Sequence, residues 1–169
     1  MSKRAEQICD ALVALFDEAD IAEEFDVTLG AERSYVRLSD LSGVGESVVV
    51  VVAPQMTVRE RTSNGTYARY VVVDILVLAH LTSDASADRT TMDGRAELLE
   101  DIDNYLANAA NADLTLSGGD IAQYVEPTDS RADPEIRKGL GILYDVGDLT
   151  EKRQVTGLVR AAYVVNETY

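Results

Sequence analysis

The chain has 169 residues with 46% hydrophobic side chains, and its 30 acidic residues against 15 basic ones give a formal net charge of −15. This length and composition predict one folded domain, spanning residues 1–169, with its own hydrophobic core. The acidic excess argues against unspecific attraction to nucleic-acid phosphates. It indicates either a solubilising surface or an acidic patch or lumen that repels DNA.

The cysteine count and the length of the apolar runs indicate in which compartment the chain folds and whether it enters a membrane. Cys9 is the only cysteine, so an intrachain disulfide is impossible, as is typical of proteins that fold inside a cell. No apolar run approaches the roughly 20 residues of a membrane span, and no signal-peptide pattern opens the sequence. We therefore expect no membrane partner.

The first predicted element is an amphipathic helix from Lys3 to about Ala19. Its apolar side chains recur at steps of three and four residues, which leaves a stripe that needs a surface to lie on. Alternation over residues 25–29 predicts a strand that resumes at residues 34–38, beyond Gly30. Residues 41–46 are glycine-rich, which indicates a loop.

A long β-hairpin is the best-defined prediction. Two runs rich in β-branched and aromatic residues, 47–53 and 68–81, flank Asn64-Gly65, a dipeptide that favours a type I′ turn. Two arms of about fifteen residues would reach roughly 50 Å, more than a core of this size needs. With the turn at Asn64 and Gly65, Glu60 falls opposite Arg69, a favourable charge pair.

The same register predicts the two faces of the hairpin. One face is wholly apolar and holds Val48, Val50, Val52, Pro54, Met56 and Val58 with Val71, Val73, Ile75, Val77, Ala79 and Leu81. The other face is apolar near the base and polar toward the tip, with Val49, Val51, Ala53, Leu76 and Leu78 followed by Gln55, Asp74, Arg59 and Arg61. Both faces of the base therefore need cover. Pro54 has no N–H and indicates an edge position or a bulge, which would shift part of the register by one residue.

The second half of the chain predicts a helix, an irregular region and a last strand. Residues 82–90 are expected to be a connection or a helix entry, with Thr91 or Asp93 as the cap of an amphipathic helix over about 95–108. A long irregular loop is expected at about 111–143, with a short strand at 121–125. A final strand covers 155–165. The predicted fold is α+β, a mainly antiparallel sheet with two amphipathic helices packed on it.

Candidate reactive groups are few. His80 is the only histidine and lacks a matching partner, while Asp101, Asp103 and Asn104 resemble the start of a calcium loop but lack its glycine. Asp84, Asp88 and Asp93, with His80, are the residues that a small metal-dependent enzyme or ligand-binding domain would use. We predict no catalytic, cofactor or metal site, and favour a structural or interaction protein.

A family resemblance sharpens this expectation. The segment from Tyr144 to Val165, in which an acidic turn leads through charged residues into a last strand, resembles the closing segment of tail terminator (tail completion) proteins of long-tailed bacteriophages. The upstream order of helix, strand, long hairpin and amphipathic helix is also similar. Val155 stands where an aromatic residue is common, and the region 111–143 is longer than usual.

The resemblance implies a non-enzymatic virion protein, assembled in the host cytoplasm, that forms a ring, usually a hexamer, at the phage neck. Such a ring caps the tail tube, meets the head-side connector and lets DNA pass without specific binding. The interface residues expected at the hairpin are Arg59, Arg61, Asn64, Gly65 and Arg69 at its tip and Val49, Val51, Leu76 and Leu78 at its base. Another neck or head-closure ring protein, or a small metal-dependent cytoplasmic enzyme, remains the alternative.

Overall fold

The computed structural model describes residues 3–17, 29–34, 48–63, 65–80, 85–108, 112–144 and 154–168. The elements in chain order are α1 (Lys3–Phe16), β1 (Leu29–Arg33), β2 (Val48–Ser63), β3 (Thr66–His80), α3 (Ala85–Ala107), β4 (Asp113–Thr115), β5 (Ile121–Tyr124), α4 (Pro134–Arg137), β6 (Gly141–Tyr144) and β7 (Gln154–Thr168). The predicted α+β class is confirmed. Residues 18 and 19, where the first helix was predicted to end, lie outside the described residues. So do most residues of the strand segments predicted at 25–29 and 34–38.

The sheet is organised around β3, which pairs with β2 from Thr66 to Leu78 on one side and with β7 over its full length on the other. The strand order is β1-β2-β3-β7-β5-β4, and β6 also pairs with β7. Among the described strands only β1 and β2 run parallel, so the sheet is mainly antiparallel, as predicted. The Val-rich sequences of β2 and β3 suit this central position, because a strand covered on both faces needs apolar side chains on both.

The hairpin turn lies where Asn64-Gly65 predicts it, but the register of the β2–β3 ladder differs from the predicted one. Ser63 pairs with Thr66, and Gly65 has a φ of 84°, which a glycine adopts without a steric penalty. Register shifts occur between Pro54 and Met56 and again between Arg61 and Ser63. The predicted bulge at Pro54 is confirmed, whereas the second was not expected. Because of that second shift, Arg59 lies opposite Arg69, and the predicted Glu60–Arg69 pair is wrong.

The faces of the hairpin follow the prediction only up to Pro54. Before it, Val50 and Val52 of β2 share one core with four side chains of β3, Val71, Val73, Ile75 and Val77. Beyond it, Val58 packs with Tyr70 and Val72 on the opposite face, and Met56 pairs with Val72. One unmatched residue reverses the alternation of every side chain that follows it. The assignment of Met56 and Val58 to the first face, and of Arg59 and Arg61 to the second, is therefore wrong.

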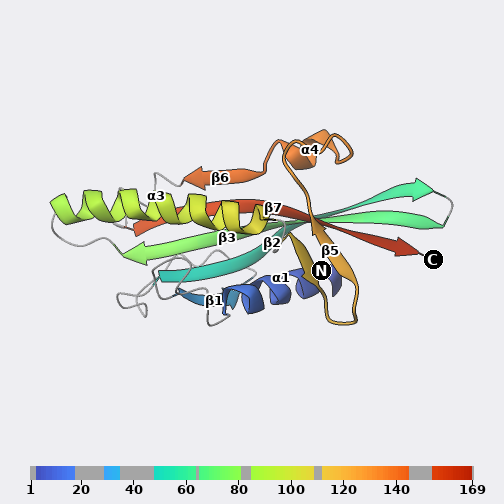
Figure 1. The fold of residues 1–169 in the computed structure, drawn as a ribbon, viewed down its shortest axis with the longest axis horizontal. Helices are drawn as coiled ribbons and strands as arrows, with labels where there is room; N and C mark the ends of the chain where they lie inside the picture. Colours follow the sequence, from blue (N-terminus) through green and yellow to red (C-terminus); the bar gives the residue numbers. More distant parts are fainter. Residues whose placement is uncertain are drawn as a thin grey trace.

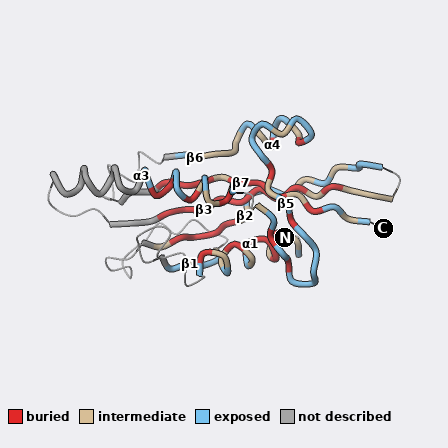
Figure 2. The backbone as a smooth tube through the Cα atoms, viewed as in Figure 1, coloured by how far each residue is buried: buried red, intermediate tan, exposed pale blue. Residues whose placement is uncertain are grey.

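The main core lies between one face of the sheet and the helices α1 and α3. Figure 2 shows the buried residues concentrated in the middle of the molecule, along the central parts of the long strands. The largest helical side chains in this core are Ile8, Leu12, Phe16, Leu99, Ile102 and Leu106. A side chain at Gly157 on β7 would collide with Leu99, so the glycine lets α3 approach the sheet closely.

The second helix begins earlier than predicted. α3 starts at Ala85, so Thr91 and Asp93 lie inside it and are not its cap. The sequence 85–94 has helix-compatible residues but no apolar stripe, which is why periodicity did not reveal this part. The expected loop at 111–143 is also wrong in part, because it contains β4, β5, α4 and β6. Only the short strand near 121–125 was predicted there.

The opposite face of the sheet is covered within the same chain. Val125, which follows β5, and Ala132 and Ile136, just before and within α4, pack on Ala68, Tyr70 and Val72 of β3. A second group on this face, at the base of the hairpin, comprises Val51, Ala53, Leu76 and Leu158. Val51 is 0% exposed and Leu76 is 1% exposed. The expectation that the base would stay uncovered in a single copy is therefore corrected for these two residues.

The distal parts of the three long strands run past the body of the molecule as an arm (Figure 1). We define the arm as residues 56–63 of β2, 65–70 of the turn and β3, and 164–168 of β7, which are paired with one another. The hairpin tip and the end of β7 lie at one end of the molecule, and the start of α3 lies at the other.

Candidate interaction surface

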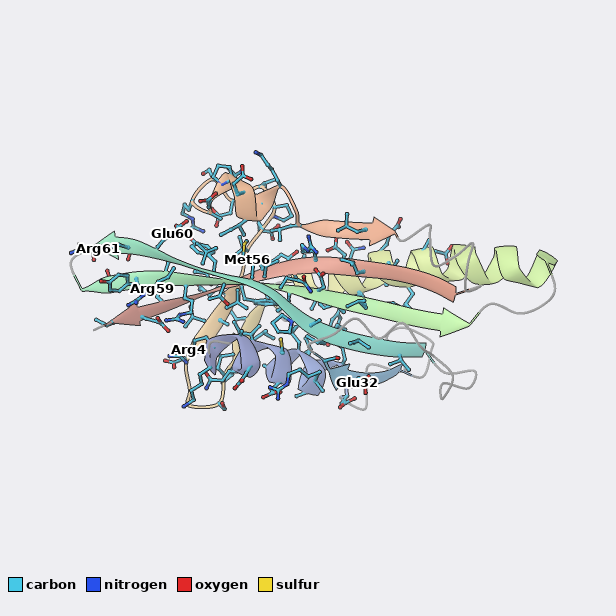
Figure 3. All side chains as sticks on the ribbon, turned by 180° about the vertical axis from the view of Figure 1, so that it is seen from behind. Arg4, Glu32, Met56, Arg59, Glu60 and Arg61 are labelled. Atoms are coloured by element: carbon cyan, nitrogen blue, oxygen red, sulfur yellow. The ribbon has the colours of Figure 1, made fainter. Side chains whose placement is uncertain are left out.

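Arginines gather on one face of the arm. Arg59 and Arg69 are cross-strand neighbours, and Arg61 pairs with Tyr67 two positions toward the tip. The guanidinium carbon of Arg59 lies 3.9 Å from the centre of the Tyr67 ring, a cation–π arrangement. Figure 3 shows Arg59 and Arg61 at the arm and Arg4 beside its root. Arg59 and Arg61 are exposed, so their charges face outward.

Glu167 of β7 ties the root of the arm to α1. Arg69 donates two hydrogen bonds to Glu167 Oε2, at 2.9 and 3.1 Å, and Arg4 donates one to Oε1 at 3.2 Å. Arg4 also lies 2.6 Å from a carboxylate oxygen of Asp120. Burial raises the pKa of Glu167, but the hydrogen bonds from Arg69 and Arg4 outweigh it and hold that pKa below its usual value. The carboxylate is therefore kept charged by two cations.

A polar cleft of about 350 Å³ lies at this root. Its lining residues are Lys3, Arg4, Gln7, Arg69, Ser117, Gly118, Asp120 and Glu167. The Gln7 amide closes one side by donating to the backbone oxygen and the hydroxyl of Ser117, at 2.5 and 2.9 Å. Charged residues that line the cleft form ion pairs with one another. We therefore interpret the cleft as part of the attachment of the arm to the body and not as a ligand pocket.

The charges of this region run against those of the chain as a whole. We call Lys3, Arg4, Arg59, Arg61 and Arg69 the basic arm surface; these are five of the chain's 15 basic residues. Three carboxylates adjoin them: Asp120 and Glu167 at the root, and Glu60 between Arg59 and Arg61 on β2. In a chain of net charge −15, this local excess of positive charge favours an acidic partner.

The arm also has an unpaired edge. The ladder between β1 and β2 ends at Val52, where Ser34 N–H donates to the Val52 carbonyl. Beyond that point, no strand in the described parts of the chain pairs with the outer edge of β2. An exposed edge leaves backbone N–H and C=O groups that a partner strand can pair with.

The structure brings together only part of the residues predicted for an interface. Arg59, Arg61 and Arg69 share one face, and Gly65 forms the turn, while Asn64 lies outside the described residues.

At the base of the hairpin, Val51 and Leu76 are buried and cannot reach a neighbour in this conformation. Val49 is half-buried, and Leu78 is placed only by its backbone pairing with Val49. Sequence reasoning missed Arg4, Lys3 and Glu167, because Arg4 and Glu167 are 163 residues apart and no local pattern links them.

The metal-site alternative gains no support from the described residues. Within the described ranges, no three His, Cys, Asp or Glu side chains gather where they could hold a metal ion. Asp84 lies outside those ranges, and for His80, Asp88 and Asp93 only the backbone is placed. Residues 101–104 are helical, so they do not form a calcium loop. No helix in the described part of the chain is long and apolar enough to cross a membrane.

Neither the protein-family models nor the curated proteins contain a match to this chain.

Proposed function

We propose that this chain is a structural, non-enzymatic virion protein that assembles with copies of itself into a ring at the neck of a tailed phage. The single observation that carries the proposal is the arm, which extends past the body and has one sheet edge that none of the described strands pairs with. The outer part of this ribbon, residues 59–63 and 65–67, supplies no buried core residue, whereas Ala68, Tyr70 and Val165 at its root belong to the cores. Such a ribbon is well suited to contact a neighbouring molecule.

The order of elements supports the same proposal. A helix, a strand, a long hairpin, an amphipathic helix and a final strand paired beside the hairpin follow one another, as in tail terminator proteins. In the proposed ring the copies number six, and the ring caps the tail tube and meets the head-side connector. The chain's net charge of −15 would let DNA pass through the lumen without adhering to it.

Tail tubes incubated with the purified protein test this function. The proposal expects rings bound at one end of each tube, visible by negative-stain electron microscopy. Rings that bind isolated head connectors and never tube ends would instead identify another neck or head-closure component. Absence of rings on both, with the tubes intact, would contradict the proposal.

A further inference from the structure

Segment 126–140 leaves the sheet and returns to the same strand. Val125, just before it, donates its N–H to the Ala162 carbonyl of β7 at 2.9 Å, and Gly141, just after it, pairs with Arg160 of β7. Gly141 has a φ of 110°, a conformation that glycine adopts without a steric penalty. Both ends of the segment are thus fixed on one strand, as in an Ω-loop. We call this segment the strap.

The strap makes its polar contacts with itself. Asp129 accepts hydrogen bonds from the backbone N–H and the guanidinium of Arg131, and Lys138 donates to Glu135 at 2.7 Å. The Asp133 carboxylate caps α4 by accepting from the Glu135 N–H. The other hydrogen bonds of the strap also stay within it. Among the described residues, no hydrogen bond or ion pair joins the strap to the sheet beneath it.

A small apolar contact holds the strap on the sheet. Ala132 and Ile136 are its buried side chains, and α4 lies on the side of the sheet away from α1 (Figure 1). They pack on a strip of the sheet that consists of Ala68, Tyr70, Val72 and Ala162. The main core on the other face holds far more apolar side chains. Because the free energy of burial scales with apolar area, the strap should be held less strongly than α1 and α3.

We propose that the strap is a hinged cover, which lifts off the sheet as a unit about Val125 and Gly141 while the three long strands stay folded. Segments with few buried apolar contacts open at a lower free energy than the core, often as contiguous units. The polar contacts inside the strap persist in the open form, because none of them has to break. Opening uncovers the apolar strip on β3 and β7. The inference concerns the single chain and does not depend on the proposed ring.

Thiol labelling on the two faces of β7 tests the strap. Ala162 lies in the strip and is 0% exposed, whereas its neighbour Ala161 faces the main core and is 1% exposed. The variants Ala162→Cys and Ala161→Cys are treated with iodoacetamide at pH 8, and mass spectrometry separates the new thiol from Cys9. A buried thiol reacts only while it is exposed. We expect Ala162→Cys to be labelled at least about tenfold faster than Ala161→Cys.

A matched pair of substitutions separates strap opening from unfolding of the sheet. Ile8→Ala removes a 0% exposed side chain of α1 in the main core. It should speed the labelling of Ala161→Cys at least about tenfold, because that site is reached by unfolding, and leave the rate for Ala162→Cys unchanged. Ile136→Ala, the same change inside the strap, should speed the labelling of Ala162→Cys by a similar factor. Urea should accelerate Ala162→Cys only weakly, since lifting the strap exposes little surface.

Several results would overturn the proposal. The strap and the sheet open together if Ala162→Cys is labelled no faster than Ala161→Cys, or if Ile8→Ala or urea accelerates both to the same extent. Labelling of Ala162→Cys as fast as a small free thiol would show that the strap does not cover the strip. An unchanged rate in the presence of Ile136→Ala would show that the apolar contact does not hold the strap.

Circular dichroism establishes that the variants fold. Where Ala162→Cys does not fold, Ala68→Cys on the same strip takes its place, and Cys9 replaces Ala161→Cys as the main-core site in the same way. Where Ile8→Ala does not fold, the urea dependence of the two rates decides.

Discussion

Arg160 of β7 lies directly opposite Asp74 of β3 and donates two hydrogen bonds to its carboxylate, at 2.6 and 2.8 Å. Asp74 is 0% exposed, whereas Arg160 is partly exposed. The hydrogen bonds to Asp74 raise the pKa of Arg160, although burial opposes them. The pair lies in the middle of the sheet, where a carboxylate without its cation would be costly.

Substitution Arg160→Met should therefore destabilise the fold by about 3 kcal/mol, because it leaves a buried carboxylate without its guanidinium partner. Urea unfolding at pH 7 measures the change. The double variant Asp74→Asn with Arg160→Met should recover part of the loss. A loss below about 0.5 kcal/mol for Arg160→Met would show that the pair does not stabilise the sheet.

Removal of the Tyr163 hydroxyl, unlike removal of the Arg160 guanidinium, should not destabilise the fold. Tyr163 is 0% exposed, and its hydroxyl has no hydrogen-bond partner among the described residues. Burial raises its pKa, and the ring meets Tyr124 edge to face at 5.8 Å. Tyr163→Phe keeps the ring and removes the buried polar atom, so it should leave stability unchanged or raise it by about 1 kcal/mol. Destabilisation by more than 1 kcal/mol would mean that the hydroxyl does have a partner in solution.

Glu167 predicts a defined pH dependence. Its pKa is lowered in the folded protein, so the unfolded chain binds the proton more readily. The stabilisation from its pairs with Arg69 and Arg4 is therefore fully present above the unfolded pKa of about 4.3 and is lost as the pH falls below it. The difference in unfolding free energy between wild type and Glu167→Gln should shrink from pH 7 to pH 3. A constant difference over this range would refute the assignment.

Cys9 should be protected in the folded state. It is 0% exposed, and desolvation by burial raises the pKa of its thiol to about 12. Since the thiolate is the reactive form, a thiol reagent such as DTNB should label Cys9 at pH 8 only on the timescale of unfolding. Labelling of the native protein as fast as that of a small free thiol would contradict the packing of α1 on the sheet.

The sequence predicted the fold class and missed what depends on distant pairing. The run Val48–Ala53 is apolar at every position and predicted a strand that needs cover on both faces, while Asn64-Gly65 placed the turn and so the two faces of the hairpin base. The shift near Arg61 has no signal in the residue types, so the charge opposite Arg69 came out with the wrong sign.

Burial at the hairpin base and the ion pairs of the arm could not be predicted from local sequence patterns, because both depend on residues that are distant in the sequence. Val51 and Leu76 are covered by tertiary packing, which a periodicity argument cannot supply. Asp74 was expected in a polar region but lies in the sheet interior, paired with an arginine 86 residues away. The candidate surface was thus predicted at Arg59, Arg61 and Arg69, and its α1 and β7 components were not.

The molar mass of the purified wild-type chain in solution tests self-assembly most directly. Light scattering after size exclusion, over a series of protein concentrations at low salt, should give a closed multimer several times the 18.4 kDa mass of one chain, with six copies expected. The multimer should dissociate as salt is raised. A mass of one chain at every concentration, with no larger species when tail tubes are added, would contradict the account.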